Sequence, residues 1–291
     1  MSEQKTVYVN SRNNFVSKWK YVLAVLLIVV LVLMIFFRIR IKVTNDAFAK
    51  EIEQFASFNK STVFSIDGIY MFSSAGATNN TDPKPEWNLN IFQYTDIALY
   101  INNRSSEDLN KENAIKSLKI SNINFSGMKI GNQSLYYKNI NNFGKSKLSS
   151  VKTSENYEDI EKDRINGELS YKVLGNEEID YNEPTMFEDA SIPICLEYVN
   201  NNVKDNEIFS NINDKINYNG SLLRNANVNL NDLAGYVSFT IEIENYLNHV
   251  YRTTVNLDIP LQDSVTGETI YDGKYIHSLA GDGLIKFYRI K

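Results

Sequence analysis

Cysteine is nearly missing from this sequence, and its scarcity limits what can hold the fold together. Cys195 is the only one, so no disulfide can form within the chain. A small secreted module would usually carry several cysteines, so a domain of this size must rely on its own hydrophobic core. That suits a bacterial surface protein without demonstrating export.

Basic residues are outnumbered by acidic ones. The chain has 30 Lys and Arg against 35 Asp and Glu, a net charge of −5. A nucleic-acid partner would need a basic patch that displaces counterions, so we expect no nucleic acid. The 43% hydrophobic and 22% charged content is ordinary for a globular protein and excludes disorder of the whole chain.

Proline occurs only five times, whereas tyrosine occurs 18 times and asparagine recurs in clusters such as Asn200–Asn202. Tyr and Ile favour strands, and Asn supports turns and tolerates left-handed backbone. We attribute the bias mainly to an AT-rich genome, which suggests a bacterium of low GC content. Such a composition also produces Asn-x-Ser/Thr matches by chance, as at Asn103-Arg104-Ser105.

Charge and helix breakers are both missing from Tyr21 to Phe37. As a helix this run spans roughly 26 Å at 1.5 Å per residue, and continuing to Ile41 reaches about 30 Å, the thickness of a bilayer core. Arg38 and Arg40 would snorkel, and Trp19 lies where an interfacial aromatic belt is expected. The pattern predicts a transmembrane helix over 21–41, with the lipid bilayer as its partner.

The flanking charges do not decide the orientation of this helix. Lys5, Arg12, Lys18 and Lys20 precede it, and Arg38, Arg40, Lys42 and Lys50 follow it. A long C-terminal domain translocates largely regardless of charge, whereas a short basic tail resists export. We therefore expect a single-pass protein of the cell membrane with a cytoplasmic N-terminus. The small-x-small site at Ala47–Ala49 is separated from the apolar run by basic residues, which favours retention over cleavage.

The rest of the chain reads as mainly β. Val237, Phe239, Ile241 and Ile243 alternate strictly with polar residues, and after a turn at 245–249 a second strand returns with Thr253, Val255, Leu257 and Ile259 on one face. This predicts an antiparallel hairpin with one face buried in the core and the other face, which carries Thr240 and Glu242, toward water. The strand at 116–125 changes phase after Ile120, which indicates a β-bulge.

Other strand signals are less regular. A strand over 62–72 should end in a turn-rich loop that begins near Gly76, and the next strand, from Leu89 to Ile101, is interrupted by the polar run Gln93–Asp96. Another strand is expected at 192–199, with Pro193 at its start. Further strands are expected at 269–271, 274–279 and 284–290.

These patterns predict an N-terminal transmembrane helix followed by an antiparallel β-sandwich, Ig-like in class, built as one sandwich or as two modules. Asn45 is expected to cap a separate juxtamembrane helix. The expected parts are a tail (1–20), the transmembrane helix (21–41), a juxtamembrane helix or stalk (44–58), a β-rich module (60–143), a polar linker or long loop (144–166) and a second β-rich module (167–291).

Residues typical of catalysis are few. Cys195 is the one candidate nucleophile, but the Thr-Leu-x-Thr-Cys pattern of sortases is absent, and we expect Cys195 to pack as a small apolar side chain. His249 and His277 would serve as its base only if the fold brought them close. The Ser-x-x-Lys matches at 57–60 and 126–129 lack the partner motifs of acyl enzymes.

No other motif assigns a reaction. Glu242 and Glu244 fit a solvated strand surface better than a glycosidase pair. We expect no catalytic, metal or cofactor site, and no cofactor. The expected function is a non-enzymatic binding or structural component of the cell envelope, with another envelope protein or a wall glycan as partner. The alternative is an envelope hydrolase or transpeptidase whose motifs are not recognised.

Overall fold

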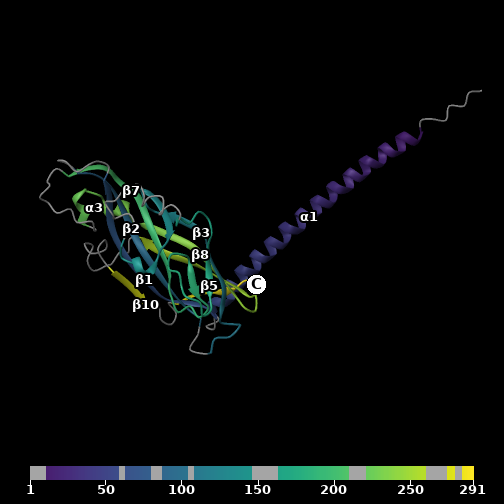
Figure 1. The fold of residues 1–291 in the computed structure, drawn as a ribbon. Coiled ribbons are helices and arrows are strands. Elements are labelled where there is room, and N and C mark those ends of the chain that lie inside the picture. The colour runs from purple at the N-terminus through teal and green to yellow at the C-terminus, as the bar shows by residue number, and fades with distance from the viewer. Residues whose placement is uncertain are drawn as a thin grey trace, which may run out of the picture. The chain divides into compact units, whose positions relative to one another are not determined.

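The computed structural model describes residues 11–58, 63–79, 87–103, 108–145, 163–209, 221–259, 274–278 and 284–291 (Figure 1). The chain forms two compact units, Met1–Ser57 and Phe58–Lys291.

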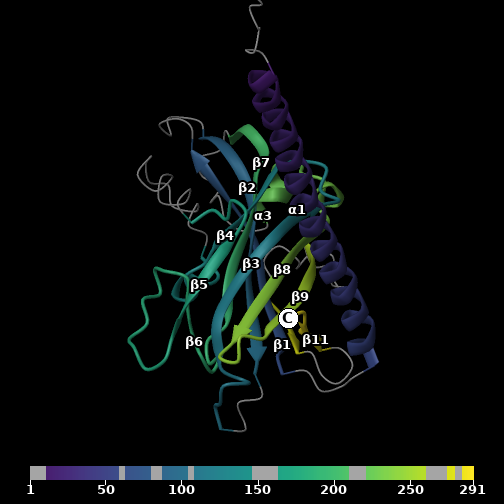
Figure 2. The same cartoon turned by 90° about the vertical axis from the view of Figure 1, so that its right-hand side faces the viewer.

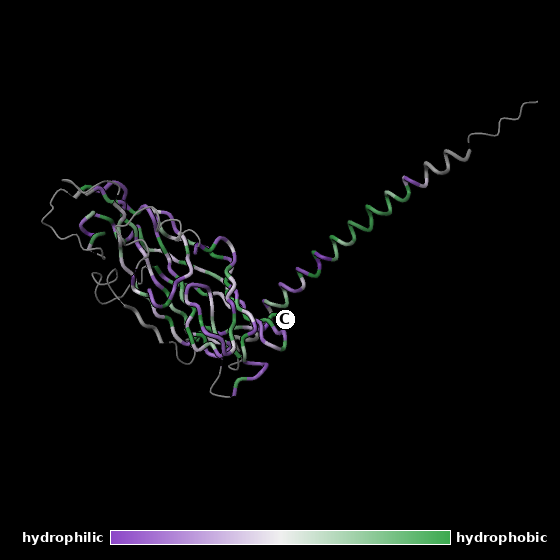
Figure 3. Tube along the Cα trace, in the orientation of Figure 1, coloured by the Kyte–Doolittle hydropathy of each residue, from purple (hydrophilic) through white to green (hydrophobic). Residues whose placement is uncertain are grey.

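The first unit is a single helix, α1, from Ser11 to Phe58. Its segment Trp19–Lys50 is long and apolar enough to span a membrane, and none of its most apolar window is buried by other parts of the protein. Figure 3 shows a continuous hydrophobic stretch in the middle of this helix, with hydrophilic residues toward its ends.

The helix is longer than the sequence pattern indicated. It begins at Ser11, inside the expected tail, and passes through Asn45 without a break, so the expected cap at Asn45 is wrong. No Gly or Pro interrupts the helix here, and the Thr44 hydroxyl bonds to the carbonyl of Arg40 at 2.9 Å instead of competing with the helix.

The second unit is built from two six-stranded sheets, and the predicted antiparallel β-sandwich is confirmed (Figure 2). Sheet A has the order β10 (Lys274–Ser278), β1 (Ser65–Asn79), β2 (Trp87–Asn102), β7 (Ile194–Phe209), β4 (Asn132–Tyr137), with β11 (Ile285–Lys286) also paired to β1. Sheet B has the order β12 (Tyr288–Arg289), β9 (Val250–Ile259), β8 (Gly235–Asn245), β3 (Ile115–Ser126), β5 (Leu169–Leu174), β6 (Thr185–Phe187).

Strand pairing combines the two halves of the sequence. The pairs are antiparallel except β5 with β6. Each sheet contains strands from both 60–143 and 167–291, so the two β-rich ranges expected from the sequence share one sandwich. The strand order differs from the ABED and CFG sheets of an immunoglobulin domain.

The main core lies between the inner faces of the two sheets. The four apolar residues predicted to face inward from β8 (Val237, Phe239, Ile241, Ile243) are all fully buried, which confirms the hairpin. They pack in one cluster with inner residues of sheet A such as Ile97, Leu99 and Leu196. The buried aliphatic and aromatic area of this cluster is the main source of stability for a domain without disulfides.

A smaller core extends sheet A beyond the sandwich. There Ala75 and Ala77 of β1 and Leu89 of β2 pack against the short helix α3 (Ser221–Asn225) and the 3-10 turn η3 (Leu230–Asp232). β1 therefore runs through Gly76 to Asn79, and the loop expected to begin near Gly76 is wrong. Glycine is needed at that position because a Cβ would lie 2.5 Å from the ring of Phe92 on the neighbouring strand.

Asparagine has a structural role that its composition alone did not indicate. Five of the six non-glycine residues with positive φ among the described residues are asparagine: Asn122, Asn202, Asn206, Asn227 and Asn248. Asn tolerates this left-handed backbone better than other side chains with a Cβ. Asn122 lies at the register shift in β3, which confirms the predicted bulge.

Candidate functional site

Cys195 is buried on the outer face of sheet A, which is the face turned away from sheet B. Its neighbours Ile194 and Leu196 point into the main core, so Cys195 points the other way. The side chain is buried, and burial together with the negative charge of Asp96 raises the pKa of its thiol to about 12. A nucleophilic cysteine needs the opposite environment, one that stabilises the thiolate.

Neither histidine is placed to act as a base for Cys195. Pairing registers connect His277 to Ile69, Leu99 and then Ile194, so Cys195 lies three strands away from His277, roughly 14 Å across the sheet. His249 lies in the β8–β9 turn of sheet B, on the other side of sheet A from the thiol. The described residues therefore form no Cys–His pair at this position.

The remaining sequence candidates are also separated. Ser126 ends strand β3 rather than lying on a helix, and Lys129 pairs with Asp232 at 3.3 Å. Lys60 lies outside the described residues, so the other Ser-x-x-Lys match is not placed. Glu244 pairs with Lys116 at 2.7 Å.

Glu242 lies between two cations on neighbouring strands. Arg252 of β9 and Lys119 of β3 stand directly beside it in register, with contacts of 2.5 and 3.2 Å. Burial by itself would raise the pKa of this carboxyl, but hydrogen bonds from Arg252 and Lys119 lower it below its usual value. A general acid needs a raised pKa, so Glu242 does not fit that role.

A buried group of charges lies beside Cys195, and the sequence patterns did not indicate it. Asp96 of β2 and Glu197 of β7 are directly opposite in register, on the outer face of sheet A. The ammonium of Lys138, just after β4, lies 3.0 Å from Asp96 Oδ1 and 3.4 Å from Glu197 Oε1. All three side chains are 0–3% exposed. We refer to Asp96, Glu197 and Lys138 as the charge cluster.

The segment from Lys138 to Lys145 is fastened to this cluster. The Gly144 amide donates to Asp96 Oδ2 at 2.7 Å, and Lys138 Nζ donates to the Lys145 carbonyl at 2.7 Å. Burial and the neighbouring Glu197 raise the Asp96 pKa from 3.8 to about 7, although Lys138 and Gly144 act in the opposite direction. The cluster can therefore hold a proton near neutral pH.

One sequence signal could have revealed the cluster. On the outer face of β2, Asp96 lies between Tyr94 and Ala98, and on β7 Glu197 lies between Cys195 and Val199. A charged residue with apolar neighbours two positions away on each side indicates a strand whose second face is also covered. The polar run Gln93–Asp96, which the alternation pattern indicates as an interruption, is instead a continuous part of β2 with its side chains buried.

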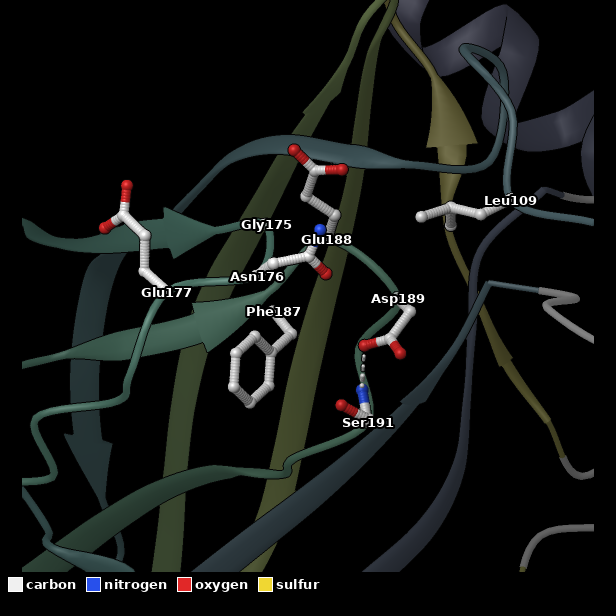
Figure 4. A pocket seen from close by; sticks show the side chains of 8 residues that line it. All are labelled: Leu109, Gly175, Asn176, Glu177, Phe187, Glu188, Asp189 and Ser191. Atoms are coloured by element: carbon white, nitrogen blue, oxygen red, sulfur yellow. Dashed lines mark hydrogen bonds between the residues drawn. The ribbon is translucent and has the colours of Figure 1, made fainter.

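An open pocket of about 490 Å³ lies at one end of the sandwich (Figure 4). Its lining comes from the loop after β5, from the end of β6 and the loop that follows it, and from the 108–113 loop: Leu109, Gly175, Asn176, Glu177, Phe187, Glu188, Asp189 and Ser191. Leu109 is exposed here, and Tyr246 and Leu247 of the nearby β8–β9 turn are exposed as well.

The three carboxylates of this pocket do not converge on one point. Asp189 accepts the Ser191 amide at 3.0 Å, as the dashed line in Figure 4 shows. Glu188 accepts the Tyr246 hydroxyl, and Glu177 pairs with Lys172 at 3.9 Å. A glycosidase needs two carboxylates that face each other across the scissile bond, so this arrangement fits contact with a ligand better than its hydrolysis.

Among the described residues, no three His, Cys, Asp or Glu side chains are grouped so that they could hold a metal ion. Comparison of the chain with family models, with curated proteins and with solved structures found no match.

Proposed function

We propose that the protein is a membrane-anchored, non-enzymatic component of the cell envelope whose sandwich contacts another envelope protein or a wall glycan. The observation that carries this proposal is the joining of α1, apolar and unburied over a length that suits a bilayer, to a β-sandwich with its own core. A helix that is apolar all round lies in the core of a large protein or in a membrane, and no part of the described chain buries this one.

The proposed orientation puts the N-terminus in the cytoplasm and the sandwich outside. Basic residues are balanced on the two sides of the apolar run, and the sandwich is the long flank that translocates readily. The domain has a single, buried cysteine and needs no disulfide to fold. Its stability therefore does not depend on whether its compartment is oxidising or reducing. Retention of α1 makes it a signal anchor.

Binding is preferred over catalysis because the candidate reactive groups are dispersed or sealed. Cys195 is buried with a raised pKa, and the carboxylates of the open pocket each contact a different partner. The pocket instead combines Phe187 and the exposed Leu109 with hydrogen-bonding groups. Apolar and aromatic contact with a few polar groups is typical of a binding surface.

The orientation is tested with single introduced cysteines. Cys195 is buried and the pKa of its thiol is raised, so we expect it to add no background to labelling by a membrane-impermeant maleimide. Ser191→Cys, at an exposed position of the pocket, should label in intact cells with a permeable wall, whereas Ser2→Cys should label only after lysis. The reverse pattern would rule out the extracytoplasmic placement.

The binding surface is tested with a photo-crosslinking amino acid at either end of β8. Tyr246 and Tyr236 are both exposed, at 43% and 55%, but only Tyr246 lies beside the pocket, through its bond to Glu188. Crosslinking in cells from position 246 should give a defined adduct to a protein or glycan, and position 236 should not. Equal adducts at both positions would remove the pocket from the proposal. Turnover of purified wall glycan by the chain would instead favour the hydrolase or transpeptidase.

A further inference from the structure

We propose that Asp96, Glu197 and Lys138 form a proton-operated latch, which holds residues 138–145 tightly on sheet A when the cluster carries one proton and loosely when that proton is lost. The proposal does not depend on the membrane-anchored binding function, because it concerns only contacts inside the sandwich.

The placement of the two carboxylates favours uptake of a proton. Asp96 and Glu197 are directly opposite in register, and both are almost completely removed from water. Two buried carboxylates side by side repel each other, and burial of a charge is expensive, so a carboxyl in such a place takes up a proton. With one proton on the pair this repulsion is removed and the ion pair with Lys138 is kept.

The other groups around Asp96 do not supply a compensating charge. On β1, the residue opposite Asp96 is Phe72, and on β2 its same-face neighbours are Tyr94 and Ala98. On β7, Cys195 stays neutral because burial raises the pKa of its thiol to about 12. Lys138 is therefore the cation that lowers the Asp96 pKa, and burial and Glu197 outweigh it.

The latch acts through two direct contacts with the segment. Asp96 accepts a hydrogen bond from the Gly144 amide, and Lys138 donates one to the Lys145 carbonyl. The C-terminal end of the segment is therefore hydrogen-bonded to the charge cluster. The ring of Phe143 packs against the ring of Tyr70 on β1, with their centroids 5.2 Å apart, which adds an apolar contact beside the charges. In the proposed open state this segment lifts from the sheet and water reaches Asp96.

The direction of the pH effect follows from the Asp96 pKa. The closed state has a pKa of about 7 and a solvated aspartate has 3.8, so the closed state binds the proton more tightly. Stability of the closed segment is therefore greatest below about pH 4, falls as the pH rises toward 7, and is constant above it. Opening should become roughly 10- to 100-fold more frequent between pH 5 and pH 8.

Hydrogen exchange of the full chain in lipid nanodiscs tests the latch. Selective ¹⁵N-glycine labelling leaves 13 glycine amides, one of which is Gly144. After correction for intrinsic exchange, protection of the Gly144 amide should fall about 10- to 100-fold from pH 5 to pH 8. Gly235, at the start of β8, should show no such change. Equal protection of Gly144 at both pH values would overturn the proposal.

Variants identify the group that binds the proton. Asp96→Asn keeps an oxygen that accepts the Gly144 amide but cannot ionise, so it should abolish the pH dependence. Glu197→Gln removes the repulsion that favours proton uptake, so it should reduce the pH dependence of Gly144 protection. This second variant serves as the test if Asp96→Asn does not fold. A pH dependence unchanged in both variants would overturn the proposal. So would a ¹³C titration of the native Asp96 carboxyl with its midpoint near pH 4.

Discussion

Glu242 and Asp96 are both carboxylates in central strands with cations beside them, and their pKa values move in opposite directions. Glu242, on the outer face of sheet B, is 14% exposed and has two cations, Arg252 and Lys119. Asp96, on the outer face of sheet A, is fully buried and shares Lys138 with Glu197. The pKa falls at Glu242 and rises at Asp96. Burial and the neighbouring carboxylate decide the direction at Asp96, not the presence of a cation.

The same contrast separates the two sheets. The outer face of sheet B has partly exposed polar side chains, and its inner face is apolar. Sheet A is buried on both faces near the charge cluster, where Phe92, Tyr94, Tyr136 and Val199 form an apolar group on the outer face. In a sheet covered on both sides, buried charged residues lie against each other rather than against water, as Asp96, Glu197 and Lys138 do.

The largest expected effect comes from the core that both sheets share. Phe239→Ala should lower the free energy of unfolding by about 3–5 kcal/mol, because it removes a fully buried ring. Urea unfolding of the chain in detergent measures this. Thr254→Ala, at an exposed position on the adjacent strand, is the matched control and should change stability by about 0.5 kcal/mol or less. Equal losses in both variants would contradict the register of the hairpin.

A somewhat smaller loss is expected at the charge cluster. Lys138→Met keeps much of the side-chain volume but removes the cation beside the buried Asp96, which should cost about 3 kcal/mol at pH 8. The loss should be smaller at pH 5, where Asp96 is protonated. Lys145→Met is the control, because Lys145 contributes its backbone carbonyl and not its side chain. A loss that is the same at both pH values would mean that the carboxylates do not respond to the missing cation.

The smallest effect is expected at Glu242. Glu242→Ala removes two cross-strand ion pairs that are partly open to water, so it should cost about 0.5–1 kcal/mol at pH 7. Because the pKa of Glu242 is lowered in the folded state, this contribution is present above about pH 4.5 and is lost as the pH falls. Unfolding midpoints at pH 7 and pH 3 measure it. A loss as large as that of Lys138→Met would remove the contrast between the two faces.

Sequence alone predicted the parts of the fold where one face of a strand is exposed to solvent. Alternation located the β8–β9 hairpin, and the change of phase after Ile120 located the β3 bulge. The expectation that Thr240 and Glu242 face water was wrong in part. Thr240 is 6% exposed, and the Glu242 side chain 14%, because ion pairs and neighbouring side chains cover this face near the centre of the sheet.

Alternation failed where both faces of a strand are covered. Asp96, Lys138 and Glu197 are far apart in the sequence, and only the pairing of β2, β7 and β4 brings them together. Gly76 resembled a turn residue, but its small size instead makes room for Phe92. The expected absence of catalytic and cofactor residues stays a prediction, as do the partners and the membrane orientation.

The asparagine bulges of β7 have a consequence for how copies of this protein behave when they are crowded together. Beyond Asn201, β7 pairs with β2 and, among the described residues, with no strand on its other side. Its register shifts twice along this length, next to Asn202 and Asn206 in left-handed conformation. An interrupted edge cannot offer evenly spaced amides and carbonyls to a strand of another molecule. The protein should therefore resist edge-to-edge aggregation even with a long strand partly uncovered.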